Sequence, residues 1–453
     1  MKNAIKTLVK YLPKFLFYGI ISLGSNAGVS EWQTRQTQNL LWATTCGFKS
    51  RCRHLSRMSE TLKSRVLAFF IFENLITSGY SIKMVQKGIS MKEKRDSSLD
   101  VVRIFAVLSV ISVHYFLNSG FYNNIVAGKR MFVMVTVRGF FMVCVPLFIM
   151  LTGYLMSKKE LSPKYYCGIV KTLATYVLAS IACIIFKNLY MGGAYGVKES
   201  ILGILDFSAA NYSWYVEMYI GLFLIIPFLN LSYNGLKNQK QKQILICTLL
   251  LLTSIPAVTN IFNFYVDSWW IHPTLSDTYQ KILPSYWKAL YPITIYFIGA
   301  YLKEYGLRLN RKICMLSLIG LTILSGIFNY YRSYNSVFIW GPWTDYNSIF
   351  VILMAVLVFY IIVKEEKWNN LPHFARKILR HLSEWTLGAY LLSYIFDAIL
   401  YPRLSSTVSE FSYMFEYFFV CVPVVFVCSM LGAWMLNFIY KFIYTLFKKS
   451  IAK

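Results

Sequence analysis

The chain has 453 residues, of which 57% are hydrophobic, 17% are aromatic and only 15% are charged. This charged fraction is well below the roughly 25% of an ordinary soluble domain, so the composition excludes a typical soluble protein. The formal net charge of +26 does not indicate a nucleic-acid-binding protein, because the basic residues lie mostly in short segments between apolar runs. We therefore expect a lipid bilayer, and no nucleic acid, as the partner of this chain.

Residues 1–95 are predicted to be a basic N-terminal extension. The two apolar pieces in it, 15–24 and 66–76, are shorter than the about 17 to 25 residues of a transmembrane helix. A secretory signal peptide is a poor fit, since no small-residue cleavage site follows a single apolar core. One hypothesis is that the native product starts at Met91, which opens a short charged tail before the first long apolar run. The alternative is a basic amphipathic extension at the membrane surface.

Long apolar segments recur between residues 96 and 445, and we expect them to form one all-α membrane domain, followed by a tail over 446–453. Each segment has the length and composition of a transmembrane helix. About ten spans are predicted, over residues 99–117, 133–155, 166–188, 213–232, 243–261, 286–302, 312–330, 347–363, 383–401 and 414–440.

The basic residues alternate between the two sides of this predicted bundle. Loops on the side of its N-terminal end are rich in lysine and arginine, and the opposite loops are rich in aromatic and small polar residues, as in 263–280 and 332–347. The positive-inside rule then places the N- and C-terminal ends of the bundle in the cytoplasm. The aromatic loops suit anchoring at the membrane interface, and also stacking on sugars.

The first span, "LDVVRIFAVLSVISVHYF" (99–116), contains Asp100, Arg103 and His114. Ionisable residues within a membrane span are costly and commonly functional. Residues eleven apart on an α-helix differ by three turns plus about 20°, so Arg103 and His114 share one face, about 16 Å apart along the axis. Asp100 lies one turn before Arg103, where it can form an ion pair with it.

These residue types suit acyl transfer. A guanidinium binds a phosphate or carboxylate through two hydrogen bonds, and a histidine can take the proton from a hydroxyl that attacks a carbonyl. The structural alternatives are that Arg103 extends to the lipid headgroups, that Asp100 caps the helix, and that His114 is a satisfied polar residue. The residues alone leave both interpretations open.

At these positions the sequence resembles the membrane acyltransferase-3 family, which includes bacterial O-acetyltransferases of surface polysaccharides and peptidoglycan. The first span of that family carries arginine or lysine, ten residues, and then histidine, as Arg103 and His114 do. The segments "VPLFIMLTGYLM" (145–156) and "SWYVEMYIGLFLIIPFL" (213–229) resemble two further family segments in the same order. The resemblance covers about 96–445.

The resemblance implies that His114 is the catalytic base and that Arg103 helps to handle the donor. It implies acetyl-CoA, or another acyl-CoA, as co-substrate, with no bound cofactor, and the sequence shows no metal-ligand set. Glu217, an acid within an apolar run, could orient His114 or contact a sugar hydroxyl; because it lies near the beginning of its span, it could also simply reach interfacial water. The further candidate residues for binding donor or substrate are Asp100, Lys158, Lys159, Tyr154, Trp214, Tyr215 and Glu217.

Two departures from the family pattern stand out. Ser393 lies where many members have a histidine, within "LGAYLLSYIFD" (387–397), and lysines replace arginines after the second span. Lysine attracts phosphate as a point charge but lacks the bidentate geometry of arginine.

The sequence thus predicts a multi-pass O-acyltransferase of the bacterial cytoplasmic membrane. It would transfer an acetyl group from acyl-CoA to a hydroxyl of a cell-surface glycan or its lipid-linked precursor. The alternatives are a transporter or flippase of a lipid-linked glycan, and a polytopic glycan polymerase. No internal repeat supports the transporter, and the external loops are too short and poor in arginine for the polymerase.

Overall fold

The computed structural model describes residues 95–193, 195–275, 278–408 and 410–451. The chain divides into two units, Met1–Ser90 and Met91–Lys453. The first unit is outside the described residues, as is the sequence before Arg95, so the hypothesis about Met91 and the predicted extension stay predictions.

The described part of the second unit is all-α, as the sequence predicts, apart from the isolated bridges Ile125↔Val337 and Val126↔Tyr334. Short 3-10 turns join the α-helices. In chain order the helices are α4 (Ser97–Asn118), α5 (Gly128–Phe141), α6 (Cys144–Met156), α7 (Pro163–Cys167), α8 (Val170–Tyr190), α9 (Val197–Leu205), α10 (Trp214–Asn234), α11 (Gln239–Thr253), α12 (Pro256–Thr259), α13 (Tyr291–Tyr305), α14 (Arg311–Ser333), α15 (Ile349–Val363), α16 (His373–Thr407) and α17 (Phe418–Ile451).

Among the described residues, eight helical segments are long and apolar enough to cross a membrane, rather than the ten expected. The two expected spans that are not among the eight are 286–302 and 383–401, which correspond to α13 and α16. Helix α13 has only 15 residues, because Pro292 lies in its first turn and Gly306, with a φ of +63°, ends it. Helix α16 has 35 residues, but Glu384 and Asp397 lie within its apolar stretch and make it more polar than the other spans.

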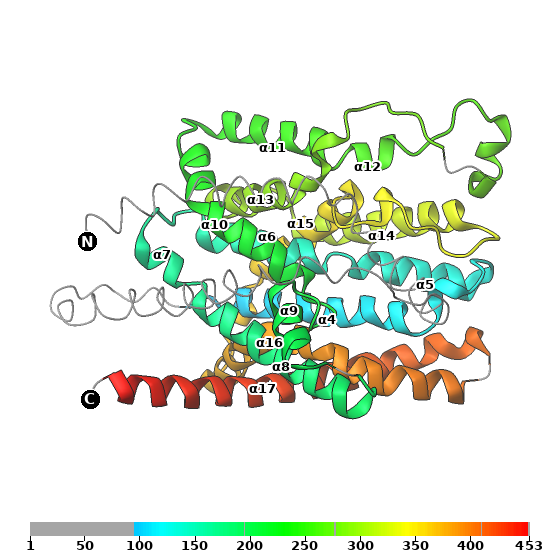
Figure 1. The fold of residues 1–453 in the computed structure, drawn as a ribbon. Coiled ribbons are helices and arrows are strands. Elements are labelled where there is room, and N and C mark those ends of the chain that lie inside the picture. Colours follow the sequence, from blue (N-terminus) through cyan, green and yellow to red (C-terminus); the bar gives the residue numbers. More distant parts are fainter. Residues whose placement is uncertain (1–94, 194, 276–277, 409, 452–453) are drawn as a thin grey trace, which may run out of the picture. The chain divides into compact units, whose positions relative to one another are not determined.

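Helix α4 lies at the centre of the bundle, between α5 and α6 on one side and α16 and α17 on the other (Figure 1). The side chain of Asp96 caps its N-terminus by accepting a hydrogen bond from the backbone N–H of Ser98. Of its most apolar stretch, 72% is buried, the largest share of any of the eight spans. The ionisable residues of α4 therefore face protein rather than lipid.

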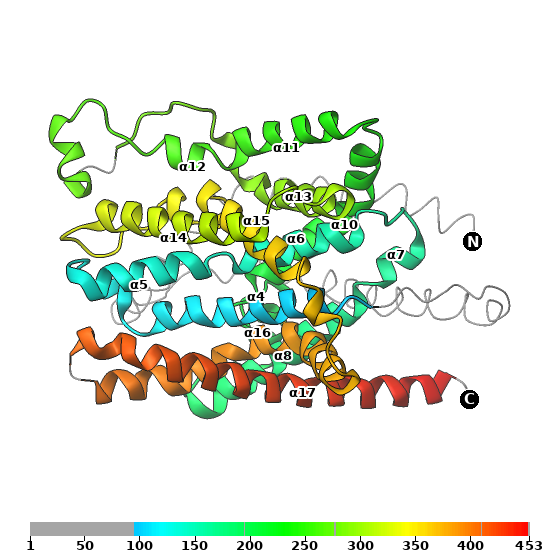
Figure 2. The ribbon, with the colours of Figure 1, turned by 180° about the vertical axis from the view of Figure 1, so that it is seen from behind.

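The two ends of the bundle differ. The start of α4, the α7 segment and the end of α17 lie at one end, and the long connection between α12 and α13 lies at the other (Figures 1 and 2). The lysine-rich loops and the aromatic loops thus belong to opposite ends, as the predicted alternation requires. The assignment of the lysine-rich end to the cytoplasm stays a prediction.

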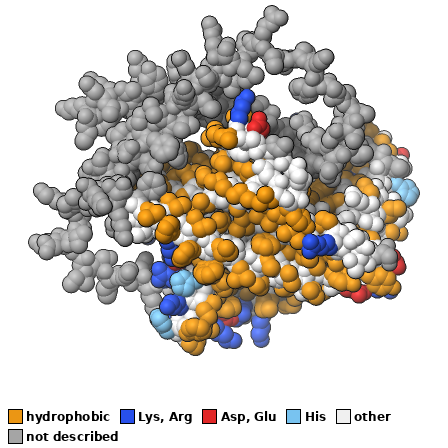
Figure 3. Space-filling model, turned by 60° about the horizontal axis from the view of Figure 1, so that its bottom comes forward, with side chains coloured by type: hydrophobic (Ala, Val, Ile, Leu, Met, Phe, Trp, Pro, Cys, Tyr) orange, Lys and Arg blue, Asp and Glu red, His pale blue; other side chains and the backbone are white. Residues whose placement is uncertain are grey.

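The outer surface is apolar over wide areas, and Figure 3 shows one face covered largely by hydrophobic side chains with few charges. Helix α17 contributes a series of exposed apolar residues, namely Phe419, Val424, Val427, Leu431, Trp434 and Phe438. A surface of this kind is suited to contact with lipid chains. The protein is a multi-pass integral membrane protein.

Helices α6 and α13 pack so closely that glycine is required on both. A Cβ atom on Gly153 would collide with the carbonyl of Tyr296, and one on Gly299 would collide with the carbonyl of Met150. Small residues allow this approach between membrane helices. The hydroxyl of Tyr296 donates to Oδ1 of Asn230 at 2.6 Å, which ties α10 to the same pair of helices.

We predict that Gly299→Ala separates α6 from α13 and lowers stability by about 1–3 kcal/mol, since the added methyl group has no room. Gly320→Ala is the matched control, because a Cβ at this helical glycine on α14 would meet no other atom within 4 Å. Apparent melting temperatures in detergent should fall for Gly299→Ala and stay level or rise for Gly320→Ala. Equal melting temperatures for the two variants would contradict this packing.

Candidate functional site

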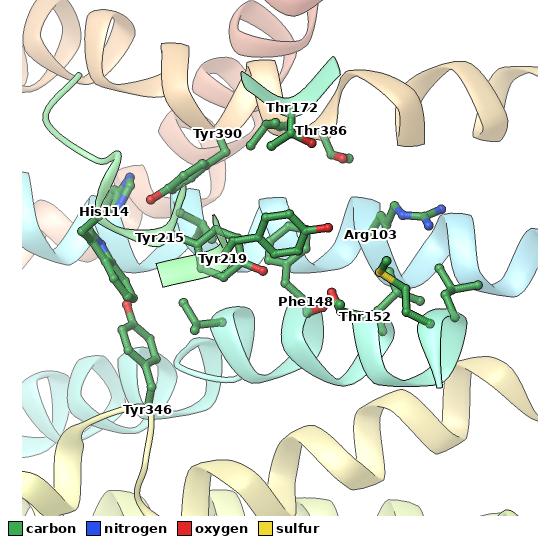
Figure 4. A pocket seen from close by; sticks show the side chains of 17 residues that line it. Arg103, His114, Phe148, Thr152, Thr172, Tyr215, Tyr219, Tyr346, Thr386 and Tyr390 are labelled. Atoms are coloured by element: carbon green, nitrogen blue, oxygen red, sulfur yellow. Dashed lines mark hydrogen bonds between the residues drawn. The ribbon is translucent and has the colours of Figure 1, made fainter. Parts of the chain in front are cut away.

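A cavity of about 280 Å³ lies between α4, α6, α8, α10 and α16. Arg103 and His114 both line it from α4, at opposite ends, as their eleven-residue spacing predicts (Figure 4). Aromatic side chains form much of the wall between and around them, namely Phe148, Trp214, Tyr215, Tyr219, Tyr346 and Tyr390. The cavity thus has a permanent cation at one end and an imidazole at the other, with largely apolar and aromatic walls between them.

A carboxylate lies behind the imidazole of His114. Nδ1 of His114 is 3.6 Å from Oδ2 of Asp397, a residue of α16 that is 1% exposed. This distance is longer than a hydrogen bond, but catalytic contacts are often long before substrate binds. With Nδ1 directed to Asp397, Nε2 is the nitrogen left for the cavity.

Tyr212 holds both members of this pair. Its ring lies over the imidazole of His114, with 3.7 Å between ring centroids, and its hydroxyl donates to Oδ2 of Asp397 at 3.0 Å. Asn118, one turn beyond His114 on α4, donates to the hydroxyl of Tyr212 at 3.1 Å. The imidazole is therefore packed against a ring on its face, and a carboxylate lies at its edge.

The local sequence of α16 explains why Asp397, and not Ser393, performs this role. Ser393 is fully buried, and its hydroxyl donates to the carbonyl of Tyr390 at 2.8 Å within the same helix. Asp397 follows one helical turn later. Its Oδ1 has no hydrogen-bond partner among the described residues, so the carboxylate can still accept another hydrogen bond.

At the other end of the cavity, Asp100 binds two arginines. It accepts hydrogen bonds from Nε and Nη2 of Arg95 at 3.0 and 2.6 Å, and one from Nη1 of Arg103 at 3.2 Å. The hydrogen bonds to Asp100 raise the pKa of Arg95 above its ordinary value, so Arg95 stays charged. Nη1 of Arg103 also donates to Oγ of Ser383 on α16 at 3.2 Å. Asp100 thus holds Arg103 in place and does not itself line the cavity.

Of the other residues singled out in the sequence, Trp214 and Tyr215 line the cavity.

The remaining candidates do not line it. Lys158 and Lys159 are exposed in the turn after α6, outside the cavity. Tyr154 packs against the ring of Phe359, and Nζ of Lys303 lies 4.8 Å from the centroid of its ring. Glu217 is exposed on α10, so the carboxylate beside His114 is that of Asp397.

Sequence reasoning missed Asp397, Tyr212, Tyr346 and Tyr390. A signal for Asp397 was present, since an acid inside an apolar run is a functional candidate by the same argument that selects Arg103 and His114. The three tyrosines carry no such signal, because aromatic residues are frequent throughout this chain.

The arrangement is suited to accept and return a proton at Nε2 of His114. A carboxylate beside Nδ1 holds the ring and stabilises its protonated form. The guanidinium at the far end can bind an anionic group of a long ligand that reaches the imidazole. Among the described residues, no group of three or more His, Cys, Asp or Glu side chains is placed to hold a metal ion.

Residues 96–433 match the family model of the acyltransferase-3 proteins, described as an acyltransferase domain. The chain belongs to the acyltransferase-3 family. The match covers most of the chain and contains the cavity, His114, Asp397 and Arg103. No curated protein and no solved structure gives a significant match. Family membership makes this protein a membrane-bound acyltransferase, which acts on an acyl donor and an acyl acceptor.

We predict that Asp397→Asn lowers kcat by about 10²–10⁴-fold, the range that a positioned proton-transfer group contributes, and leaves KM for the donor unchanged. The amide keeps the shape of the side chain but cannot stabilise the protonated imidazole. Asp397→Glu, which restores the charge, should recover part of kcat.

Glu384→Gln, on the same helix, is the matched control and should retain activity. The readout is acyl transfer per folded protein, with folding followed by size-exclusion chromatography in detergent. A normal kcat for folded Asp397→Asn would show that Asp397 does not position the base.

Proposed function

We propose that this acyltransferase transfers an acetyl group from acetyl-CoA to a hydroxyl of a cell-surface glycan or its lipid-linked precursor, with His114 as the general base. One observation carries the proposal: His114, backed by Asp397, and Arg103 lie at opposite ends of a single cavity. A donor with an anionic end and a reactive end fits this polarity.

Acyl-CoA is such a donor, because its phosphates lie at one end of the molecule and its thioester at the other. Arg103 supplies a charge and bidentate geometry for an anion at one end of the cavity. Lys158 and Lys159, exposed in the turn after α6, add positive charge at the end of the bundle where α4 starts and concentrate anions there. The thioester end would then extend about 16 Å along α4 to His114.

The chemical step needs only this imidazole and its carboxylate. As the acceptor hydroxyl oxygen attacks the thioester carbonyl carbon, Nε2 of His114 takes the hydroxyl proton. The carbon–sulfur bond then breaks, and the thiolate leaves and takes the proton back from the imidazolium. The products are an O-acyl ester and free CoA, and Asp397 stabilises the cation that forms between the two proton transfers.

The acceptor would come from the opposite end of the bundle. The loops at that end, 263–280 and 332–347, are rich in aromatic and small polar residues that suit contact with sugars. If the lysine-rich end is cytoplasmic, these loops face outward, where a bacterial cell-surface glycan or its lipid-linked precursor is found. The protein would then reside in the bacterial cytoplasmic membrane.

We predict that His114→Ala abolishes transfer of labelled acetyl groups from acetyl-CoA to cell-envelope glycans, because His114 is the one His, Asp or Glu among the described residues that line the cavity. The assay uses membranes with equal amounts of inserted wild-type or variant protein and measures alkali-labile label. His373→Ala, which changes an exposed histidine at the start of α16, is the matched control and should keep activity.

Equal label in wild type and His114→Ala would remove His114 as the base. Absence of label with the wild type, in membranes that contain inserted protein, would reject acetyl-CoA or the glycan as substrate.

A further inference from the structure

The side chains that line the cavity differ in size and flexibility between its two ends. The residues toward Arg103 are small or flexible. They include Thr172 and Thr386 (Figure 4), and also Leu155 and Met156, which follow Thr152 on α6, the helix whose labelled residues Phe148 and Thr152 run toward Arg103. Near His114, the rings of Tyr215, Tyr346 and Tyr390 form the wall (Figure 4), and Trp214 packs against Tyr346. Val145 precedes Phe148 on α6 and so lies toward the same end. The space beside the imidazole is therefore bounded by groups that cannot move aside easily.

Two of these rings stack on each other. The ring centroids of Trp214 and Tyr346 are 5.5 Å apart, with an interplanar angle of 21°. Trp214 is the first residue of α10, and Tyr346 lies in the turn just before α15. The α4 residues that line the cavity extend no further than His114, which lies at the same end of the cavity as Tyr346 in Figure 4.

The turn that carries Tyr346 is held by several hydrogen bonds. The backbone N–H of Tyr346 donates to Oδ1 of Asp345 at 2.8 Å, and the side chain of Asn347 donates to the carbonyl of Thr253 on α11 at 3.1 Å. Tyr346 is 8% exposed. These contacts hold the backbone that carries Tyr346, and its buried ring packs against Trp214, so this part of the wall is stiff.

We infer that Trp214, Tyr346 and Val145 limit the length of the acyl group that the enzyme transfers. The inference rests on the proposed function, because it places the reacting carbonyl at His114. In a reactive complex the carbonyl carbon lies about 3–3.5 Å from the attacking oxygen, so the acyl chain must occupy the space beside the imidazole.

Only a short acyl chain fits in that space. The whole cavity, at about 280 Å³, is slightly below the about 300–1,000 Å³ of typical ligand pockets, and the arm of the donor must share it. An acetyl group adds one methyl group beyond the carbonyl. A butyryl group adds two more carbon atoms, which would press against the stacked rings or against Val145.

The test is a competition between acetyl-CoA and butyryl-CoA, with a different label on each acyl group. Because both products form in one sample, their ratio does not depend on how much protein is folded. We expect wild type to prefer acetyl, since one methylene group at a tight site changes relative rates by about 10–200-fold. Tyr346→Leu and, on α6, Val145→Ala should each reduce this preference by about tenfold or more.

Leu155→Ala is the matched control, because Leu155 lines the cavity at the Arg103 end. It should leave the ratio of acetyl to butyryl products as in wild type. The two enlarging variants change different segments, the turn before α15 and helix α6, and differ in how much packing they remove, so a folding defect in one leaves the other informative.

Two results would overturn the inference while leaving the proposed function intact: equal use of both donors by wild type, or an unchanged ratio in both Tyr346→Leu and Val145→Ala. A ratio that shifts as much in Leu155→Ala as in these variants would also overturn it. Failure of wild type to transfer either acyl group would instead reject the proposed function, and the inference with it.

Discussion

The cost of placing ionisable groups inside an apolar bundle determines much of this structure. Helix α4 carries Asp100, Arg103 and His114, and none of them can face lipid without a large free-energy penalty. The fold meets this constraint by enclosing α4 on most sides and by giving each group a partner. Arg103 contacts Asp100 and Ser383, and His114 contacts Asp397 and Tyr212. Helix α16 supplies a partner at both ends, which explains why it packs directly against α4.

This pairing also separates two kinds of charge along one cavity. At the Arg103 end the charge is permanent, because a guanidinium keeps its proton, and Asp100 offsets only part of the positive charge of Arg95 and Arg103. At the His114 end the charge appears only when the imidazole takes a proton, and Asp397 is placed to stabilise it at that moment. Binding of an anion and transfer of a proton can therefore occur about 16 Å apart without one disturbing the other.

The sequence could predict how two site residues lie relative to each other only when both belong to the same helix. The shared face of Arg103 and His114 follows from helix periodicity alone, and the structure reproduces it. The pairing of His114 with Asp397 spans more than 280 residues and depends on how α16 packs, which no local pattern records. The count of spans failed for similar reasons: α13 is short because Pro292 and Gly306 bound it, and α16 is less apolar because it carries Glu384 and Asp397.

The central claim is that one donor molecule spans the cavity, with its anionic end at Arg103 and its acyl group at His114. The most direct measurement is a cryo-electron microscopy structure of the protein in a lipid nanodisc with a non-reactive thioether analogue of acetyl-CoA. We expect the phosphates near Arg103 and the carbonyl carbon of the analogue about 4–6 Å from Nε2 of His114, so that an acceptor hydroxyl oxygen fits between them, in hydrogen-bond reach of Nε2 and about 3–3.5 Å from the carbonyl carbon. An analogue bound outside the cavity, or bound with its acyl group near Arg103, would contradict the account.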